Sequence, residues 1–138
     1  MCVLQVNNIK KHFGDLEVLK GVSFCLEQGQ VLALIGSSGG GKSTLLRCIN
    51  LLENPTSGQI LYHGDNVMNR GFNVPTYRSR VGMVFQSFNL FNNMTVLKNC
   101  MVGQQVVLKK SASEAKEMAL QYLEKVGMAP YIKARPSQ

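Results

Sequence analysis

One short stretch of the chain concentrates residue types that suit the binding of an anion. It reads Gly36-Ser37-Ser38-Gly39-Gly40-Gly41-Lys42-Ser43, followed by Thr44, and it fits the pattern G-x-x-x-x-G-K-[ST]. Glycines let the backbone curl until successive N–H groups point inward at phosphate oxygens. Lys42 then supplies a compact positive charge to the β- and γ-phosphates, Ser43 a hydroxyl ligand for Mg²⁺, and Thr44 a hydrogen bond to a phosphate oxygen. The stretch from Gly36 to Thr44 therefore predicts a P-loop, a site for a nucleoside triphosphate with magnesium.

The segments on either side of the glycines support this interpretation. Residues 31–35, Val-Leu-Ala-Leu-Ile, are apolar on both faces, which predicts a central parallel strand covered by helices. Residues 43–52 predict a short helix that ends before Asn54-Pro55, and its positive N-terminal end points at the same anion. A flexible Gly-Ser linker is the alternative for residues 37–40. A linker is not expected directly between an apolar strand and an apolar helix, so we favour the P-loop.

The bulk composition is that of a soluble globular protein. The chain has 138 residues, of which 45% are hydrophobic and 17% charged, a size that suits one domain. The formal charge of +7 could favour a partner that carries phosphates or an anionic surface. The alternative is that the basic side chains are simply solvated. Without a dense basic run interleaved with aromatics, no nucleic-acid groove is indicated. With neither a secretory signal nor a run of about twenty apolar residues, we expect a cytoplasmic protein whose membrane role is peripheral.

The cysteines predict no metal site. Cys2, Cys25, Cys48 and Cys100 are far apart in sequence, and no C-x-x-C spacing accompanies them. Free cysteines behave as small hydrophobes in apolar segments. We expect reduced thiols in a cytosolic compartment rather than disulfides.

The remaining elements predict an α/β fold. Alternating or apolar runs predict strands over residues 2–9, 21–27, 57–62 and 81–85. Gly14-Asp15 predicts a turn, and residues 63–79 are polar and predict a loop. Ser111 and Glu114 form a capping-box pattern that starts a helix over 111–126, with Gly127 as its stop. The order divides the chain into a nucleotide-binding core over residues 1–90 and a helical part over residues 91–138.

Three motifs add a family resemblance. Lys11-His12-Phe13-Gly14 lies upstream of the glycine loop, Val81-Gly82-Met83-Val84-Phe85-Gln86 lies downstream, and Phe88-Asn89-Leu90-Phe91 comes before Met94-Thr95-Val96. Together with Gly36 to Thr44, these motifs resemble the ATP-binding subunits of ABC transporters, and in particular the group that imports polar amino acids. The resemblance runs over the whole chain. It implies a P-loop NTPase core of the ABC ATPase type, with an antiparallel β-subdomain and the start of the helical subdomain.

The resemblance also implies roles for individual residues. Phe13 matches the aromatic residue that stacks on adenine, a position more often tyrosine in the family, and Val18 matches a position that touches the base or ribose. Gln86 matches the Q-loop glutamine, which reaches Mg²⁺ and the γ-phosphate, so we assign catalytic roles to Lys42 and Gln86 and metal contacts to Ser43 and Gln86. Residues 88–91 would border the groove that receives the permease. An ordinary core position is the alternative for Phe13 and for these phenylalanines.

Two departures from the family pattern limit what the resemblance implies. Gly40 stands where the family commonly has serine, which should make the loop more flexible. The family's signature L-S-G-G-Q, its Walker B aspartate, its catalytic glutamate and its switch histidine have no counterpart in the sequence. We therefore expect roughly the N-terminal half of an ATPase subunit, truncated before the signature motif, which binds ATP and Mg²⁺ but does not hydrolyse ATP alone. The parent protein would hydrolyse ATP as a head-to-tail dimer on the cytoplasmic face of the cell membrane.

Two alternatives remain open from the sequence. One is an ABC ATPase with another cargo, such as a lipoprotein-release or export system. The other is a non-transport ABC protein that acts on DNA or ribosomes. The run Phe88 to Phe91 after Gln86 favours the amino-acid importer, and the absence of a basic-aromatic surface argues against nucleic acid.

Overall fold

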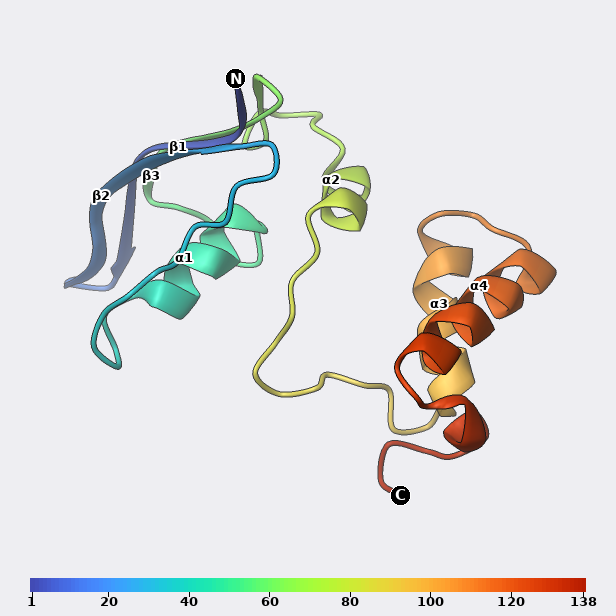
Figure 1. The fold of residues 1–138 in the computed structure, drawn as a ribbon. Helices are drawn as coiled ribbons and strands as arrows, with labels where there is room; N and C mark the ends of the chain where they lie inside the picture. Colours follow the sequence, from blue (N-terminus) through green and yellow to red (C-terminus); the bar gives the residue numbers. More distant parts are fainter. The chain divides into compact units, whose positions relative to one another are not determined.

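The computed structural model describes residues 1–138. Its longest strands, β1 (Cys2–Phe13) and β2 (Leu16–Glu27), form a hairpin (Figure 1). The predicted strands 2–9 and 21–27 are confirmed, and both continue to the turn at Gly14, where φ is 60°. The pairing is antiparallel with several register shifts. Such bulges let a long hairpin twist and bend.

A four-stranded antiparallel sheet grows from this hairpin. The predicted strand 57–62 is confirmed as β3 (Ser57–Tyr62), which pairs with β1, and the short β4 (Asp65–Asn66) completes the order β2-β1-β3-β4. Gly58 has a φ of 101°, and a Cβ there would lie 2.5 Å from the Asn8 carbonyl oxygen. Only glycine allows β3 to approach β1 this closely.

Helix α1 (Lys42–Ile49) packs its apolar side onto the sheet and closes the core. It contributes Leu45, Cys48 and Ile49, which are buried together with sheet residues that include Leu4, Val6, Ile9, Leu19 and Ile60. The helix predicted over residues 43–52 is therefore present and ends at Ile49. The start of this helix, and with it the end of the glycine loop, is fixed by the hydrophobic core.

The predicted loop over residues 63–79 is wrong in part, because it contains β4 and a helix, α2 (Val74–Arg80). Asn73 caps the helix by accepting a hydrogen bond from the Thr76 N–H at 3.1 Å. Its seven residues are too few for independent stability. Tertiary contacts instead hold α2: Tyr77 is buried, and the Arg78 guanidinium donates to carbonyls just beyond α1 at 3.0 and 2.7 Å.

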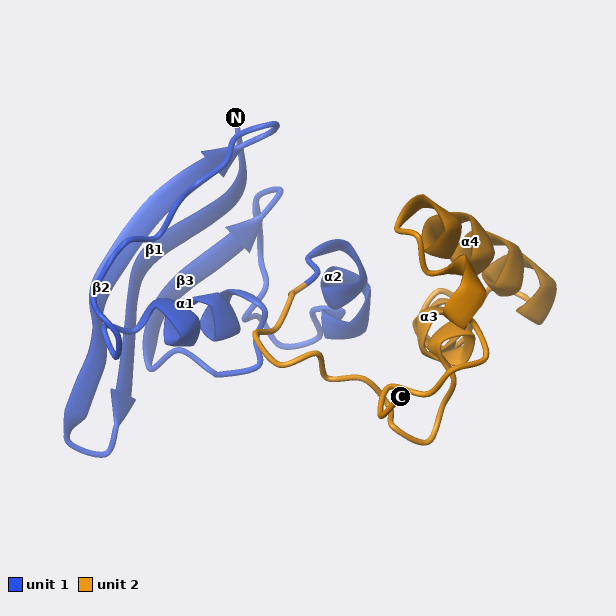
Figure 2. Cartoon of the chain, turned by 60° about the horizontal axis from the view of Figure 1, so that its bottom comes forward, with its two compact units in different colours: residues 1–82 blue, residues 83–138 orange.

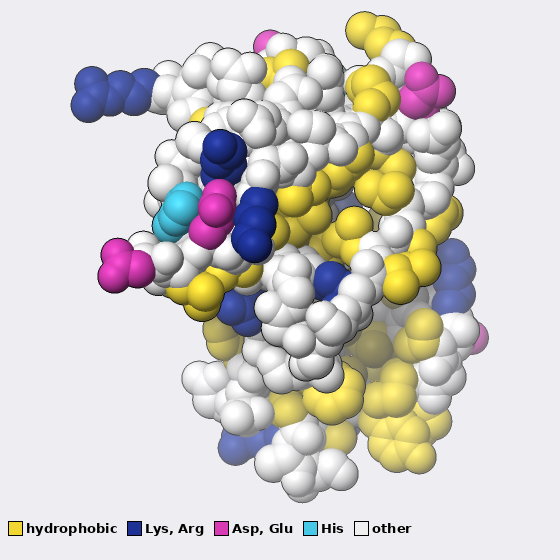
Figure 3. Space-filling view, turned by 90° about the vertical axis from the view of Figure 1, so that its left-hand side faces the viewer, with side chains coloured by type: hydrophobic (Ala, Val, Ile, Leu, Met, Phe, Trp, Pro, Cys, Tyr) yellow, Lys and Arg dark blue, Asp and Glu magenta, His cyan; other side chains and the backbone are white.

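The strands predicted over residues 31–35 and 81–85 are also wrong, since neither segment forms a strand. A run of apolar residues becomes a strand only when a neighbouring backbone satisfies its N–H and C=O groups. The sheet of this chain offers neither segment a partner. Val31, Ile35 and Val84 are consequently exposed at 96%, 95% and 99%. The space-filling view shows many hydrophobic side chains on the surface (Figure 3).

Residues 83–138 form a second compact unit, separate from residues 1–82 (Figure 2). It contains α3 (Val96–Val106), α4 (Ala112–Lys125) and the 3-10 turn η1 (Ala129–Tyr131). The predicted last helix and its capping box are confirmed, since the Ser111 hydroxyl accepts from the Glu114 N–H and the Glu114 carboxylate accepts from the Ser111 N–H. Gly127 follows with a φ of 72°. None of the helices combines the length and apolar character needed to cross a lipid bilayer.

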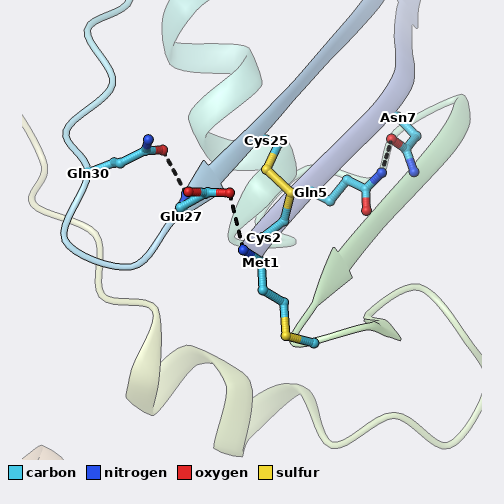
Figure 4. The surroundings of a disulfide bond; sticks show 7 residues. All are labelled: Met1, Cys2, Gln5, Asn7, Cys25, Glu27 and Gln30. Atoms are coloured by element: carbon cyan, nitrogen blue, oxygen red, sulfur yellow. Dashed lines mark hydrogen bonds and ion pairs between the residues drawn. A yellow bond between two sulfur atoms is a disulfide. The ribbon is translucent and has the colours of Figure 1, made fainter.

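The prediction of reduced thiols is wrong for one pair of cysteines. Cys2 and Cys25 lie on adjacent antiparallel strands with Cα atoms 5.6 Å apart, and they form a disulfide (Figure 4). Hairpin pairing brings them together although they are 23 residues apart in sequence. The Met1 ammonium donates to the Glu27 carboxylate beside the disulfide at 3.1 Å. Cys48 and Cys100 remain free thiols.

Candidate nucleotide-binding site

The glycine loop ends at a position fixed by β2. Gly41 is buried at the N-cap of α1 with a φ of 89°. A Cβ at this residue would lie 3.0 Å from Leu19 Cδ2 and 3.1 Å from both Cγ1 and the carbonyl oxygen of Val18. The absence of a side chain therefore lets the loop lie directly against the strand.

The Lys42 ammonium lies inside the curl of the loop. It donates hydrogen bonds to the carbonyl oxygens of Gly36 and Ser37, both at 2.6 Å. The Gly40 N–H closes the turn by donating to the Ser37 carbonyl at 3.1 Å. A compact positive charge is thus held at the centre of a loop whose residues 36–40 are exposed to solvent.

The first turn of α1 is open to an anion. No side chain caps it, and it contains no acidic residue. The unpaired N–H groups and the helix dipole together give this end a partial positive charge. The exposed Ser43 hydroxyl is in the same turn, and Thr44 is partly exposed. Mg²⁺ is often bound by few protein oxygens together with phosphate oxygens and waters, so this donor set fits a magnesium triphosphate.

The structure brings Val18 to the loop, where its Cγ1 and carbonyl face Gly41. Phe13 lies at the end of β1, pairs with Leu16, and is 46% exposed, so the ring is not an ordinary core aromatic. The Lys11 ammonium lies 4.9 Å from the centroid of this ring. The hairpin turn and the glycine loop lie toward the same end of the first unit (Figures 1 and 2).

Gln86 belongs to the second unit and is exposed, as are residues 87–91. The role of Gln86 toward Mg²⁺ and the γ-phosphate therefore stays a prediction. Phe88 and Phe91 are 88% and 54% exposed. The Asn99 amide fixes the backbone of Phe91, accepting from its N–H at 2.8 Å and donating to its carbonyl at 3.1 Å.

The sequence did not predict the residues that hold the C-terminal end of α1 by hydrogen bonds. The Tyr77 hydroxyl donates to the Ile49 carbonyl at 2.6 Å, and the Asn50 amide donates to the Val81 carbonyl at 2.7 Å. Burial, with a smaller contribution from the nearby Tyr62, raises the pKa of Tyr77 to about 12. The sequence did carry a signal for α2, because Asn73 followed by Pro75 is a helix-start pattern. It carried none for the contact between α2 and the end of α1.

Several known sequences similar to this chain belong to one kind of protein. The family described as "ABC transporter" matches residues 19–138. The glutamine transport ATP-binding protein GlnQ of Bacillus subtilis (strain 168) is 44% identical over 136 residues, covering 99% of this chain and 56% of that protein. The arginine/ornithine transport ATP-binding protein AotP of Pseudomonas aeruginosa is 45% identical over 148 residues, covering 99% of this chain and 58% of that protein. The chain thus spans just over half the length of these relatives.

Solved structures agree on the fold. A dimeric ATP-binding cassette in a post-hydrolysis state, bound to ADP and Pi, superposes with a TM-score of 0.83 at 27% identity. The match covers 98% of this chain and 62% of that one. A nucleotide-free ATP-binding cassette from an ABC transporter matches with a TM-score of 0.75 at 25% identity, over 100% of this chain and 59% of the other. The α/β fold is that of ABC ATPase domains, and this chain belongs to the ABC transporter family.

Proposed function

We propose that this chain is the nucleotide-binding part of an ATP-binding subunit that drives the import of polar amino acids. Relatives whose names specify glutamine or arginine/ornithine transport support this cargo class. In this proposal residues 1–90 supply the nucleotide-binding core and residues 91–138 begin the helical subdomain, a functional division that lies a few residues after the boundary of the compact units at residues 82 and 83. The parent protein hydrolyses ATP, and the cargo is selected by its permease and solute-binding partners.

The observation that carries the proposal is the position of the Lys42 ammonium between the carbonyls of Gly36 and Ser37. A triphosphate entering the loop offers this ammonium charged oxygens in place of two neutral carbonyls, and charge-assisted hydrogen bonds are the stronger kind. The N–H groups of residues 36–44 surround the phosphates, and the Ser43 hydroxyl holds Mg²⁺. Phe13 stacks on the adenine, while Val18 contacts the base or ribose.

The partners follow from the exposed apolar residues of the second unit. Phe88, Leu90 and Phe91 are 88%, 49% and 54% exposed, a pattern that favours a protein interface over a solvated loop. We assign this surface to the transmembrane permease subunits, on the cytoplasmic face of the cell membrane. Gln86, which precedes Phe88 in the sequence, couples nucleotide binding to the permease. A second ATPase subunit completes the head-to-tail dimer of the parent, as the dimeric solved relative supports.

Titration of the chain with a fluorescent ATP analogue and Mg²⁺ tests the proposal. Lys42→Ala removes a charge-assisted phosphate contact, so its affinity should fall by about 10- to 100-fold. Lys116→Ala is the matched control, because Lys116 is an exposed lysine on α4, and its affinity should equal the wild type. Unchanged affinity in Lys42→Ala, or an equal loss in Lys116→Ala, would refute the assignment of the site.

A further inference from the structure

Lys11, like Lys42, is a lysine of the first unit whose ammonium group is fixed by contacts within the protein. The Lys11 ammonium donates to the Asn54 carbonyl at 2.8 Å and pairs with the Glu53 carboxylate at 3.3 Å. It also lies 4.9 Å from the centroid of the Phe13 ring. Only 13% of the Lys11 side chain is exposed, although most lysines extend into solvent.

These contacts join the end of the hairpin to the segment that follows α1. Glu53 and Asn54 lie just beyond that helix, whose first residue is Lys42. Two neighbouring hydrogen bonds strengthen the junction: the Thr56 N–H donates to the Lys10 carbonyl at 2.8 Å, and the Thr56 hydroxyl accepts from the His12 N–H at 3.0 Å. The backbone next to Phe13 is therefore tied to the helix that carries the phosphate site.

The cation also determines which part of the Phe13 ring is available. An ammonium over an aromatic face is attracted by the ring quadrupole and covers that face. Phe13 nevertheless remains 46% exposed, so part of its surface stays open to a ligand. Holding the ring still before a ligand arrives lowers the entropy lost when the ligand stacks on it. Because Glu53 balances the charge of Lys11, this ammonium is not a free cation for phosphate.

We propose that Lys11 is a positioning residue for the adenine base, holding the Phe13 ring so that its exposed surface receives the base. This inference rests on the proposed function, since it requires ATP to bind at the glycine loop with its base on Phe13. In this role Lys11 raises the affinity for the base through the Phe13 ring and does not itself touch the nucleotide.

A double-mutant cycle with two ligands tests the proposal. ATP and inorganic tripolyphosphate, which lacks a base, are titrated with Mg²⁺ by calorimetry into the wild-type chain, Lys11→Met, Phe13→Leu and the double variant. Lys11→Met should lower the affinity for ATP by about three- to tenfold and leave the affinity for tripolyphosphate unchanged. In the Phe13→Leu background, Lys11→Met should have no further effect on ATP. Lys11→Arg, which keeps a cation over the ring, should restore affinity to within about twofold of the wild type.

The controls separate this role from a purely structural one. Lys20→Met removes an exposed lysine from β2 and should change neither affinity. A Lys11→Met variant that weakens ATP and tripolyphosphate alike, or keeps its full effect without Phe13, would show a structural link and overturn the proposal. So would ATP binding that is unchanged in Lys11→Met. A wild-type chain that binds neither ligand would instead refute the proposed function itself, whereas binding of both with no Lys11 effect would refute only this role.

Discussion

Replacing Tyr77 by phenylalanine tests the hydrogen bond that holds the C-terminal end of helix α1. The ring is 2% exposed and lies edge-on to Tyr62 and Phe72, with centroid distances of 5.3 and 5.8 Å. Its hydroxyl donates to the carbonyl of Ile49, the last residue of α1, at 2.6 Å. Phenylalanine keeps the ring contacts and removes only this bond, so the variant isolates one hydrogen bond at the end of the helix.

Two effects set the magnitude. Leaving a buried acceptor without its donor costs about 1–3 kcal/mol of unfolding free energy. The second effect depends on pH, because burial raises the pKa of Tyr77 to about 12 while an unfolded tyrosine titrates near 10. Between these values the unfolded chain releases a proton that the folded chain keeps, so stability falls as the pH rises through this window. The difference between the two pKa values corresponds to about 2–3 kcal/mol of unfolding free energy, which is present below pH 10 and lost by pH 12.

Urea unfolding of the full chain at a series of pH values measures both effects. The wild type should exceed Tyr77→Phe by about 2 kcal/mol at pH 8, and this advantage should shrink by about 2 kcal/mol as the pH approaches 12. Tyr131→Phe is the control, since Tyr131 is 55% exposed and its substitution should change the unfolding free energy by less than about 0.5 kcal/mol. If the Tyr77→Phe curve ran parallel to the wild type over the whole range, the hydroxyl would not be a buried neutral donor and the reasoning would fail.

Three further substitutions probe the loop and the second unit. Gly41→Ala places a Cβ 3.1 Å from the Val18 carbonyl at a φ of 89°, so we expect a loss of about 1–3 kcal/mol in stability and weaker nucleotide binding, checked by urea unfolding and titration. Gly40→Ser introduces a Cβ 3.1 Å from the Ser37 carbonyl at an ordinary φ; its stability should stay within about 1 kcal/mol of the wild type and its ATP affinity within about threefold, so a large loss in either would contradict the loop geometry. Ser111→Ala removes the N-cap of α4 and should cost about 1 kcal/mol in that unit, measured by hydrogen exchange of α4 amides, whereas Ser113→Ala should not.

Local patterns predicted the elements whose partners are near in sequence. The hairpin turn at Gly14, helix α1 and the capping box of α4 each depend on residues within a few positions of one another. The apolar runs 31–35 and 81–85 failed for the opposite reason. Their composition indicates burial, yet whether a buried run becomes a strand depends on a neighbouring backbone far away in sequence, which composition does not specify.

The candidate site shows the same division. The glycines and Lys42 were predicted from their spacing and from the apolar segments on either side, and the structure adds where the ammonium lies. The disulfide between Cys2 and Cys25 could not be predicted, because only the pairing of β1 with β2 brings the two sulfur atoms together. The contact of Lys11 with Phe13 likewise depends on the segment after α1, which holds the ammonium from the other side.

The two ends of the glycine loop are held very differently. At its C-terminal end, buried Gly41 contacts β2, and α1 continues into the core with Leu45 and Cys48. At its N-terminal end, Gly36 follows a segment without a strand partner, in which Leu34 packs against the core, and the Gly36 carbonyl is tied by the hydrogen bond from Lys42. A phosphate that draws the ammonium away would remove that tie while supplying new bonds to the loop N–H groups. We therefore expect nucleotide binding to exchange this hydrogen bond for contacts between the phosphates and the loop N–H groups. Substitutions at Gly36 should accordingly change nucleotide affinity more than the stability of the first unit, whereas those at Gly41 should lower both.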